Sequence, residues 1–171
     1  MKILKSIIAL MLVGILLIFS LPVSADDPIS ENALFVAPDG DDSYTREQND
    51  IDHPWATPQK AWENAQAGDT VYFRGGTYNV TSTISTKFAG YQGTTENPIT
   101  FQSYPGETAT IDGTTLDVTL EIEKSWNIIK NLNFIYGETA IQIGWSLYVY
   151  GGIIENCTAQ ANLGGDNTGF V

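Results

Sequence analysis

The chain has 171 residues, with 20 acidic against 8 basic side chains and a formal net charge of −12. This length allows one ordinary domain or part of a larger one, and a hydrophobic content of 43% excludes a disordered chain. A single cysteine, Cys157, excludes a disulfide framework and a cysteine-rich zinc site, and is expected to be a small buried residue. The acidity argues against a nucleic-acid partner, because such proteins present a basic surface.

The first 25 residues have the features of a secretory signal peptide. Lys2 and Lys5 precede an apolar run from Ile7 to Leu21, and Val23 and Ala25 suit a cleavage site. The alternative is a membrane anchor, but the run is short for a span. We therefore predict cleavage after Ala25, secretion of residues 26–171 to the extracellular medium, and no stable membrane insertion.

One strand and one helix are predicted before residue 69. The strand covers Ala33–Ala37 and ends at the turn Pro38–Gly40. The helix covers about residues 57–67, with Thr57 as N-cap, Pro58 at the first helical position and Gly68 as the C-terminal stop.

From about residue 69 onward, short β-rich runs alternate with turn residues, and no helical period survives. The predicted strands are 70–73, 98–101, 110–111, 120–122, 127–129, 132–134, 140–143, 152–154 and 169–171.

An internal repeat relates these strands. Residues 127–132 match 152–157 at an offset of 25, residues 137–141 loosely match 166–170, and Ile99 lies 29 residues before Ile128. Repeats of this length predict a solenoid in which each coil pairs with its neighbours at about 4.8 Å. Ile128, Leu132 and Phe134 are expected to stack on Ile153 and Cys157 in the core.

Two asparagines, Asn131 and Asn156, fall at the same repeat position. Their amides are expected to satisfy backbone groups at a tight turn, which makes both structural. Asn79–Thr81 and Asn156–Thr158 also match the glycosylation sequon.

A solenoid exposes its core at both ends and needs caps. The predicted helix can cap the first coil, whereas the sequence ends at Val171 in an expected strand. We therefore expect the C-terminus to be truncated, or another chain to cap it.

Several residues are candidates for a functional site, but each can also be explained by a structural role. Lys124 and Lys130 are possible bases by residue type only, and Lys130 is expected to face solvent. Asp39, Asp41 and Asp42 could form a weak calcium loop, although a polar turn explains them without metal. Asp166 could ligate calcium at a turn.

The remaining candidates are His53, Arg74 and four aromatic residues. His53, the only histidine, precedes Pro54 and is expected to pack rather than catalyse. Arg74 is expected to pair with Asp69, the alternative being a sugar carboxylate. The aromatic residues that could stack on sugar rings, or simply pack, are Trp126, Trp145, Tyr148 and Tyr150.

Residues 35–112 resemble the N-terminal part of right-handed parallel β-helix polysaccharide lyases, most closely the pectate lyase-like polysaccharide lyase family nine. The matching segments are Phe35–Gly40 with Asp42, 53–57, 59–61, 67–78, 97–100 and 104–106. The segment 153–170 is similar to a coil that follows in that family. The resemblance therefore implies an all-β, right-handed parallel β-helix with a short N-terminal capping helix, here the N-terminal portion.

The resemblance also implies a chemistry. In that family, calcium bridges protein carboxylates and the sugar acid, and a lysine removes the proton α to the carboxylate in a β-elimination. The family's calcium ligands and base lie in coils beyond the position of Val171, so no catalytic or metal-binding residue is carried over. The resemblance implies a secreted, calcium-dependent lyase of an acidic polysaccharide such as pectate, inactive as this fragment alone.

Two alternatives remain open. The first is a non-catalytic surface β-helix that binds glycans, and the second is a glycoside hydrolase with paired carboxylates on the same scaffold.

Overall fold

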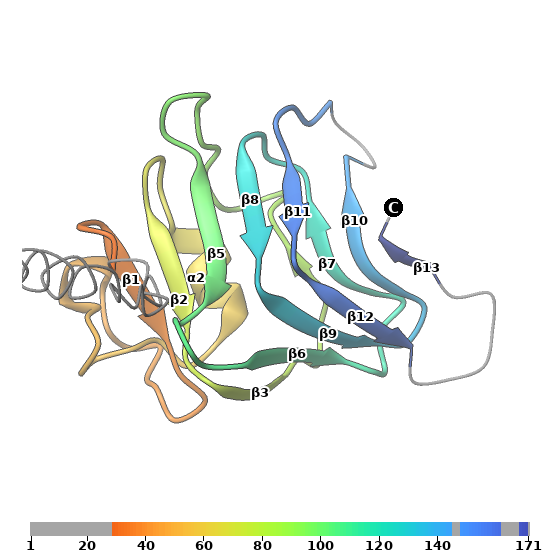
Figure 1. Cartoon of the computed structure of the whole chain (residues 1–171), viewed down its shortest axis with the longest axis horizontal. Coiled ribbons are helices and arrows are strands. Elements are labelled where there is room, and N and C mark those ends of the chain that lie inside the picture. Colours follow the sequence, from red (N-terminus) through yellow and green to blue (C-terminus); the bar gives the residue numbers. More distant parts are fainter. Residues whose placement is uncertain (1–28, 145–147, 162–167, 171) are drawn as a thin grey trace, which may run out of the picture.

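The computed structural model describes residues 29–144, 148–161 and 168–170, so the predicted leader lies outside the described residues. Within them the chain winds into a parallel β-helix (Figure 1). No helix in this part of the chain is long and apolar enough to cross a membrane.

From β2 onward, each coil contributes one strand to each of three parallel sheets, and β1 adds a further strand to the first sheet. The first sheet has the order β1 (Ala33–Val36), β2 (Thr70–Phe73), β5 (Ile99–Ser103), β8 (Asn127–Lys130) and β11 (Ile153–Glu155). The second contains β3 (Gly76–Asn79), β6 (Ala109–Gly113), β9 (Leu132–Tyr136) and β12 (Thr158–Ala161). The third contains β4 (Ile84–Ser85), β7 (Val118–Ile122), β10 (Thr139–Ile143) and β13 (Thr168–Phe170).

The strand pairing confirms most of the predicted repeat. Ile128 pairs with Ile153 and Lys130 with Glu155, at the predicted offset of 25. Thr139 pairs with Thr168, in agreement with the looser match between 137–141 and 166–170.

The predicted register of Ile99 is wrong by one residue. Ile99 pairs with Asn127, whereas Ile128 pairs with Thr100. A one-residue shift moves a side chain to the opposite face of a sheet, so the buried isoleucine of β8 is Ile129 and not Ile128. Ile153, also expected in the core, is 47% exposed. The sequence could not decide this, because two adjacent isoleucines in each repeat fit either register.

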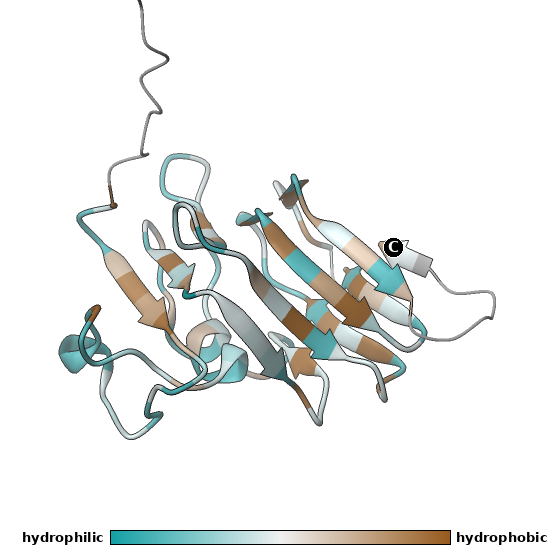
Figure 2. Cartoon of the chain, turned by 60° about the horizontal axis from the view of Figure 1, so that its bottom comes forward, coloured by the Kyte–Doolittle hydropathy of each residue, from teal (hydrophilic) through white to brown (hydrophobic). Residues whose placement is uncertain are grey.

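The core runs along the axis between the three sheets. Its largest fully buried aliphatic side chains are Ile84, Ile99, Ile111, Leu120, Ile122, Ile129 and Leu132. Phe73, Phe101 and Phe134 lie among them, and β6 and β9 alternate strictly between buried and partly exposed residues. Figure 2 shows this alternation as brown and teal bands along the strands.

Four elements of the structure were not predicted from the sequence. They are β3, β4, β12 and the 3₁₀ helix η1 (Arg46–Gln48). β3 begins with a glycine at φ +139, β4 has two residues, and β12 is polar and mostly exposed. None of them carries the apolar alternation by which a strand is recognised.

The capping helix α2 (Pro58–Asn64) is shorter than expected. It begins as predicted, since the hydroxyl of Thr57 accepts a hydrogen bond from the Lys60 amide and Pro58 occupies the first turn. It ends at Asn64 instead of Ala67. The Gln66 amide donates to the Asp69 carboxylate at 2.6 Å, and this bond replaces the helical one. Gly68, at φ +91, then turns the chain into β2.

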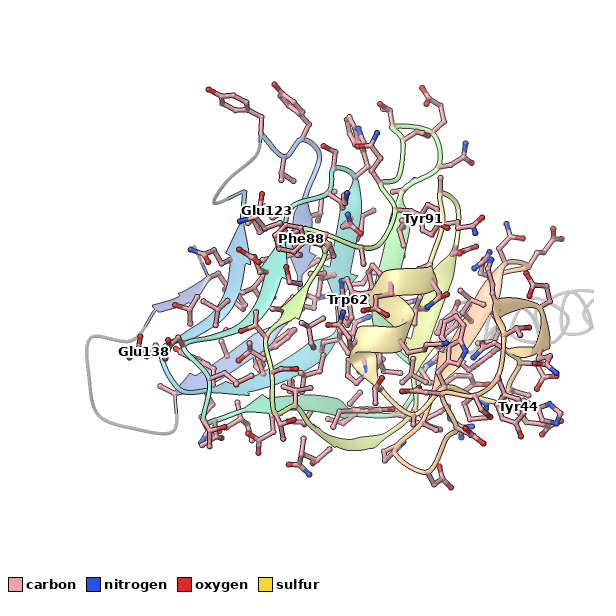
Figure 3. All side chains as sticks on the ribbon, turned by 180° about the vertical axis from the view of Figure 1, so that it is seen from behind. Tyr44, Trp62, Phe88, Tyr91, Glu123 and Glu138 are labelled. Carbon is pink, nitrogen blue, oxygen red and sulfur yellow. The ribbon has the colours of Figure 1, made fainter. Side chains whose placement is uncertain are left out.

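The helix closes the first coil through Trp62. This side chain is 2% exposed and stacks on Phe101, with 4.2 Å between ring centroids and 5° between ring planes. Phe73 also contacts Trp62, with 5.5 Å between the ring centroids. Figure 3 shows Trp62 where α2 approaches the strands. The prediction that this helix covers the first coil agrees with these contacts.

The free edge of β1 is covered by the segment between β1 and α2. The buried Asn49 side chain accepts a hydrogen bond from the Phe35 amide at 2.7 Å and donates one to the Phe35 carbonyl at 2.9 Å. Trp55 forms a parallel bridge with Val36 beside it. An open strand edge invites pairing with another chain, and Asn49 blocks that here.

Asn131 and Asn156 both have positive φ values, 57° and 50°, and both side chains are exposed. Asparagine tolerates this left-handed conformation better than most residues. Their shared position is therefore explained by the backbone bend between the first and second sheets rather than by an internal ladder of amides.

Candidate functional site

The acidic turn at residues 39–42 supports the fold of the cap. Asp42 accepts hydrogen bonds from the amides of Ala56 and Thr57 and from the Thr57 hydroxyl, at 2.8, 3.0 and 2.6 Å. Asp41 accepts one from the Ser43 amide, which lowers the pKa of the Asp41 carboxyl. These carboxylates face different partners, so they do not fit a calcium site.

No cluster of three or more histidine, cysteine or acidic residues that could hold a metal occurs among the described residues. Asp166, the other calcium candidate, lies outside them. The described residues therefore provide no donor set for the calcium ion that the family resemblance implies.

The expected pair between Arg74 and Asp69 is wrong. Arg74 instead forms a bidentate ion pair with Glu107, with Nη2–Oε1 at 2.7 Å and Nε–Oε2 at 3.0 Å. Asp69 pairs with Arg46, at 2.5 and 2.7 Å. Residues 69 and 74 stand at opposite ends of β2, and an extended strand advances about 3.3 Å per residue, which keeps the two side chains apart.

This ion pair is built into the turn after β5. The Arg74 guanidinium lies 4.8 Å from the centroid of the Tyr104 ring, and the Glu107 carboxylate also accepts from the Gly75 amide. Its hydrogen bonds with Arg74 lower the pKa of Glu107. Arg74 therefore forms an ion pair within the protein, as expected, but its partner is Glu107 and not Asp69.

His53 lies on the surface of the cap. Its Nδ1 is 2.9 Å from an Asp50 carboxylate oxygen, and its ring packs edge-on against Tyr44 with 5.1 Å between centroids. These contacts agree with the expectation that His53 packs.

The two candidate lysines lie in different places. Lys130, in β8, sits in register between Gln102 and Glu155, and Lys124 lies in the turn before β8. Cys157 is partly buried, and its thiol lies 3.4 Å from the Glu155 carbonyl and 3.6 Å from that of Ile129. Burial raises the pKa of the Cys157 thiol, as expected for an unreactive cysteine.

Three of the candidate aromatic residues lie on turns that join the third sheet to the first. Trp126 precedes β8, and Tyr148 and Tyr150 precede β11; Trp145 lies outside the described residues. Tyr148 is 90% exposed and Tyr150 is 64% exposed. Tyr148 and Tyr150 are therefore not packed inside the protein, which was the alternative to stacking on sugar rings.

Sequence reasoning missed two surface features. Ser85 donates to the Glu121 carboxylate at 2.6 Å on the outer face of the third sheet, where Gln142 lies in register with Glu121. A groove of about 390 Å³ also separates the cap from β3, with Thr57, Thr77, Asn79 and Ser82 in its walls. The polar residues that alternate along the third sheet could have indicated the contact between Ser85 and Glu121. The groove could not be predicted, because it depends on how the cap packs against β3.

Comparisons with known proteins agree with this architecture. The family described as "Pel9A-like, right handed beta helix region" matches residues 34–171. The chain is 41% identical over 80 residues to pectate lyase PEL9 of Emericella nidulans, and 36% identical over 89 residues to the uncharacterized protein YwoF of Bacillus subtilis. These matches cover 47% and 52% of this chain, but only 18% and 17% of the two relatives.

A solved structure of a rhamnogalacturonan lyase has the same fold. It matches with a TM-score of 0.58 and 19% identity, over 76% of this chain and 37% of that protein. The expected resemblance to pectate lyase-like β-helices is thereby confirmed, and the helix has the predicted right hand. The chain belongs to the Pel9A-like right-handed β-helix family.

Proposed function

We propose that this chain is the N-terminal portion of a secreted polysaccharide lyase that cleaves an acidic, uronate-containing polysaccharide such as pectate by calcium-dependent β-elimination. The observation that carries the proposal is the family match across residues 34–171, whose coils the structure describes as stacked parallel strands. A relative that is 41% identical over 80 residues is a pectate lyase.

The net charge supports the calcium dependence. A chain with a charge of −12 repels a polyanion, and a divalent cation placed between carboxylates reverses that local field. The described residues do not gather such carboxylates. We infer that the ligands and the base are supplied by coils that follow residue 171, since the matched relatives are several times longer than their matched segments.

The proposal is tested by following the ultraviolet absorbance of unsaturated uronate products. The protein encoded by the whole reading frame is incubated with polygalacturonate, with calcium and with a chelator, beside the 171-residue chain. We expect a calcium-dependent rise for the whole protein and none for the 171-residue chain. If the whole protein gives no chelator-sensitive absorbance on any polyuronate, the lyase proposal fails.

A glycan-binding protein without catalysis is the second candidate. The observation that favours it is the high exposure of Tyr148 and Tyr150, which are two positions apart on one turn. This candidate predicts retention of the whole protein by a polysaccharide without any change in the polymer's length.

A further inference from the structure

Trp126, Tyr148 and Tyr150 lie on two turns that stack on each other, and we call these three residues the aromatic ridge. The turns that enter β8 and β11 lie along one edge of the solenoid, at the top of Figure 1. The Trp126 amide donates to the Tyr150 carbonyl at 2.7 Å, and the Tyr150 amide is 3.2 Å from the Ser125 hydroxyl. These bonds between coils hold the two turns at the spacing of neighbouring strands, about 4.8 Å.

The conformation of Trp126 sets this residue apart from an ordinary turn residue. Its φ is +60°, a region that bulky side chains rarely adopt. Such strain persists only where its surroundings impose it, and it concentrates at functional sites. The Trp126 ring lies directly against Gly151, where an added Cβ would come within 1.9 Å of the ring. A glycine at φ +64° thus makes room for a tryptophan that remains partly exposed.

The exposure of the tyrosines is the second observation. Val149, between them, is partly buried, whereas Tyr148 and Tyr150 are 90% and 64% exposed. Large aromatic side chains grouped on a surface mark interaction sites. Because tyrosine combines an apolar ring face with a hydroxyl, it suits a ligand that itself has apolar faces and polar edges.

We propose that the aromatic ridge binds a polysaccharide chain through the faces of uncharged sugar rings. This inference rests on the proposed function and specifies which part of the polysaccharide substrate the aromatic ridge binds. The three ridge side chains carry no charge, and the acidic protein repels free uronates. Esterified stretches of an acidic polysaccharide, whose carboxyl groups are neutral, therefore suit the ridge best.

Affinity electrophoresis of the protein encoded by the whole reading frame tests the proposal. Native gels contain methyl-esterified polygalacturonate or its de-esterified form, and all gels contain a chelator, so calcium bridges do not contribute. We expect retardation by the esterified polymer and weaker retardation by the free acid at low salt. Trp126→Gly and Tyr148→Ala should each weaken retention by about tenfold, the loss that removing one stacking ring causes in complexes with single-stranded nucleic acids.

The matched control is Phe88→Ala. Phe88 is 92% exposed and lies on the turn that joins β4 to β5, near β4 and beside Glu123 in Figure 3. It is not part of the ridge, so its loss should leave retention unchanged. Trp126→Gly removes the ring, and glycine adopts the φ of +60° at this position without strain. The melting temperature of this variant should therefore stay close to that of the parent chain. This keeps a loss of retention from being explained by unfolding.

Several outcomes would overturn the proposal. They are no retardation by the esterified polymer, stronger retardation by the free acid at low salt, or an equal effect of Phe88→Ala. A parent chain that sediments as a dimer while Tyr148→Ala is a monomer would assign the ridge to a second copy instead. Failure of the lyase proposal would appear as missing absorbance and not as missing retention, so the two can be told apart.

Discussion

Arg74 and Glu107 join the end of β2 to the turn after β5 through three hydrogen bonds between their side chains, at 2.7, 3.0 and 3.1 Å. They are 33 residues apart in the sequence, and their pairing fixes a long turn between the first two coils. Because the two side chains remain 35% and 28% exposed, solvent screens part of their attraction.

Glu107→Gln should lower the free energy of unfolding by about 1 kcal/mol at pH 7, the range for a partly exposed bidentate pair. The hydrogen bonds from Arg74 lower the pKa of Glu107 below its usual value of 4.5. A lowered pKa gives stability that is present above 4.5 and is lost as the pH falls through the folded-state value. Denaturant unfolding at a series of pH values should show the difference shrinking below 4.5. A difference that grows on acidification would contradict this.

Asn49→Ala should lower the free energy of unfolding by about 1–3 kcal/mol, because it leaves the Phe35 amide without a partner at a buried edge, while the Phe35 carbonyl keeps the hydrogen bond from the Trp55 amide at 2.9 Å. Aggregation during heating should also increase, since the edge of β1 keeps Trp55 but loses the side chain that covers the Phe35 amide. Thermal melts with light scattering measure both effects. The exposed Asn97, changed to Ala, is the control and should change neither.

Trp62→Ala should cost about 3–5 kcal/mol, the usual range for removing a large buried aromatic side chain. Trp62→Phe should cost about 1.5 kcal/mol or less, because a ring can still stack on Phe101 and a buried indole N–H with no hydrogen-bond partner is removed. Urea unfolding of the two variants checks the order. Equal losses would show that Trp62 does not act through stacking.

Asn131→Gly should leave the free energy of unfolding within about 1 kcal/mol of the parent value, because glycine accepts φ +57° freely. Asn131→Val should lose about 2 kcal/mol, since a β-branched residue is strained there. If the asparagine amide stabilised the turn, Asn131→Gly would also lose more than about 1 kcal/mol, because it removes that amide. Chemical denaturation of both variants distinguishes the two explanations.

The repeat and the apolar alternation of the sequence were enough to predict a parallel solenoid, its capping helix and most strands. They were insufficient where two apolar residues are adjacent, as at Ile128 and Ile129, because either can point inward. The Arg74–Glu107 pair could not be predicted either, since it depends on how a turn folds back against the preceding coil. The exposure of Tyr148 and Tyr150 likewise depends on which way the turn before β11 faces.

The account is tested most directly by the mass of the products that the protein of the whole reading frame releases from polygalacturonate. The proposed elimination adds no water, so each cleavage should leave a shortened chain whose new non-reducing end is lighter by one water than a hydrolysis product, and calcium removal should abolish it. Products of full hydrolytic mass, or an intact polymer in the presence of calcium, would contradict it.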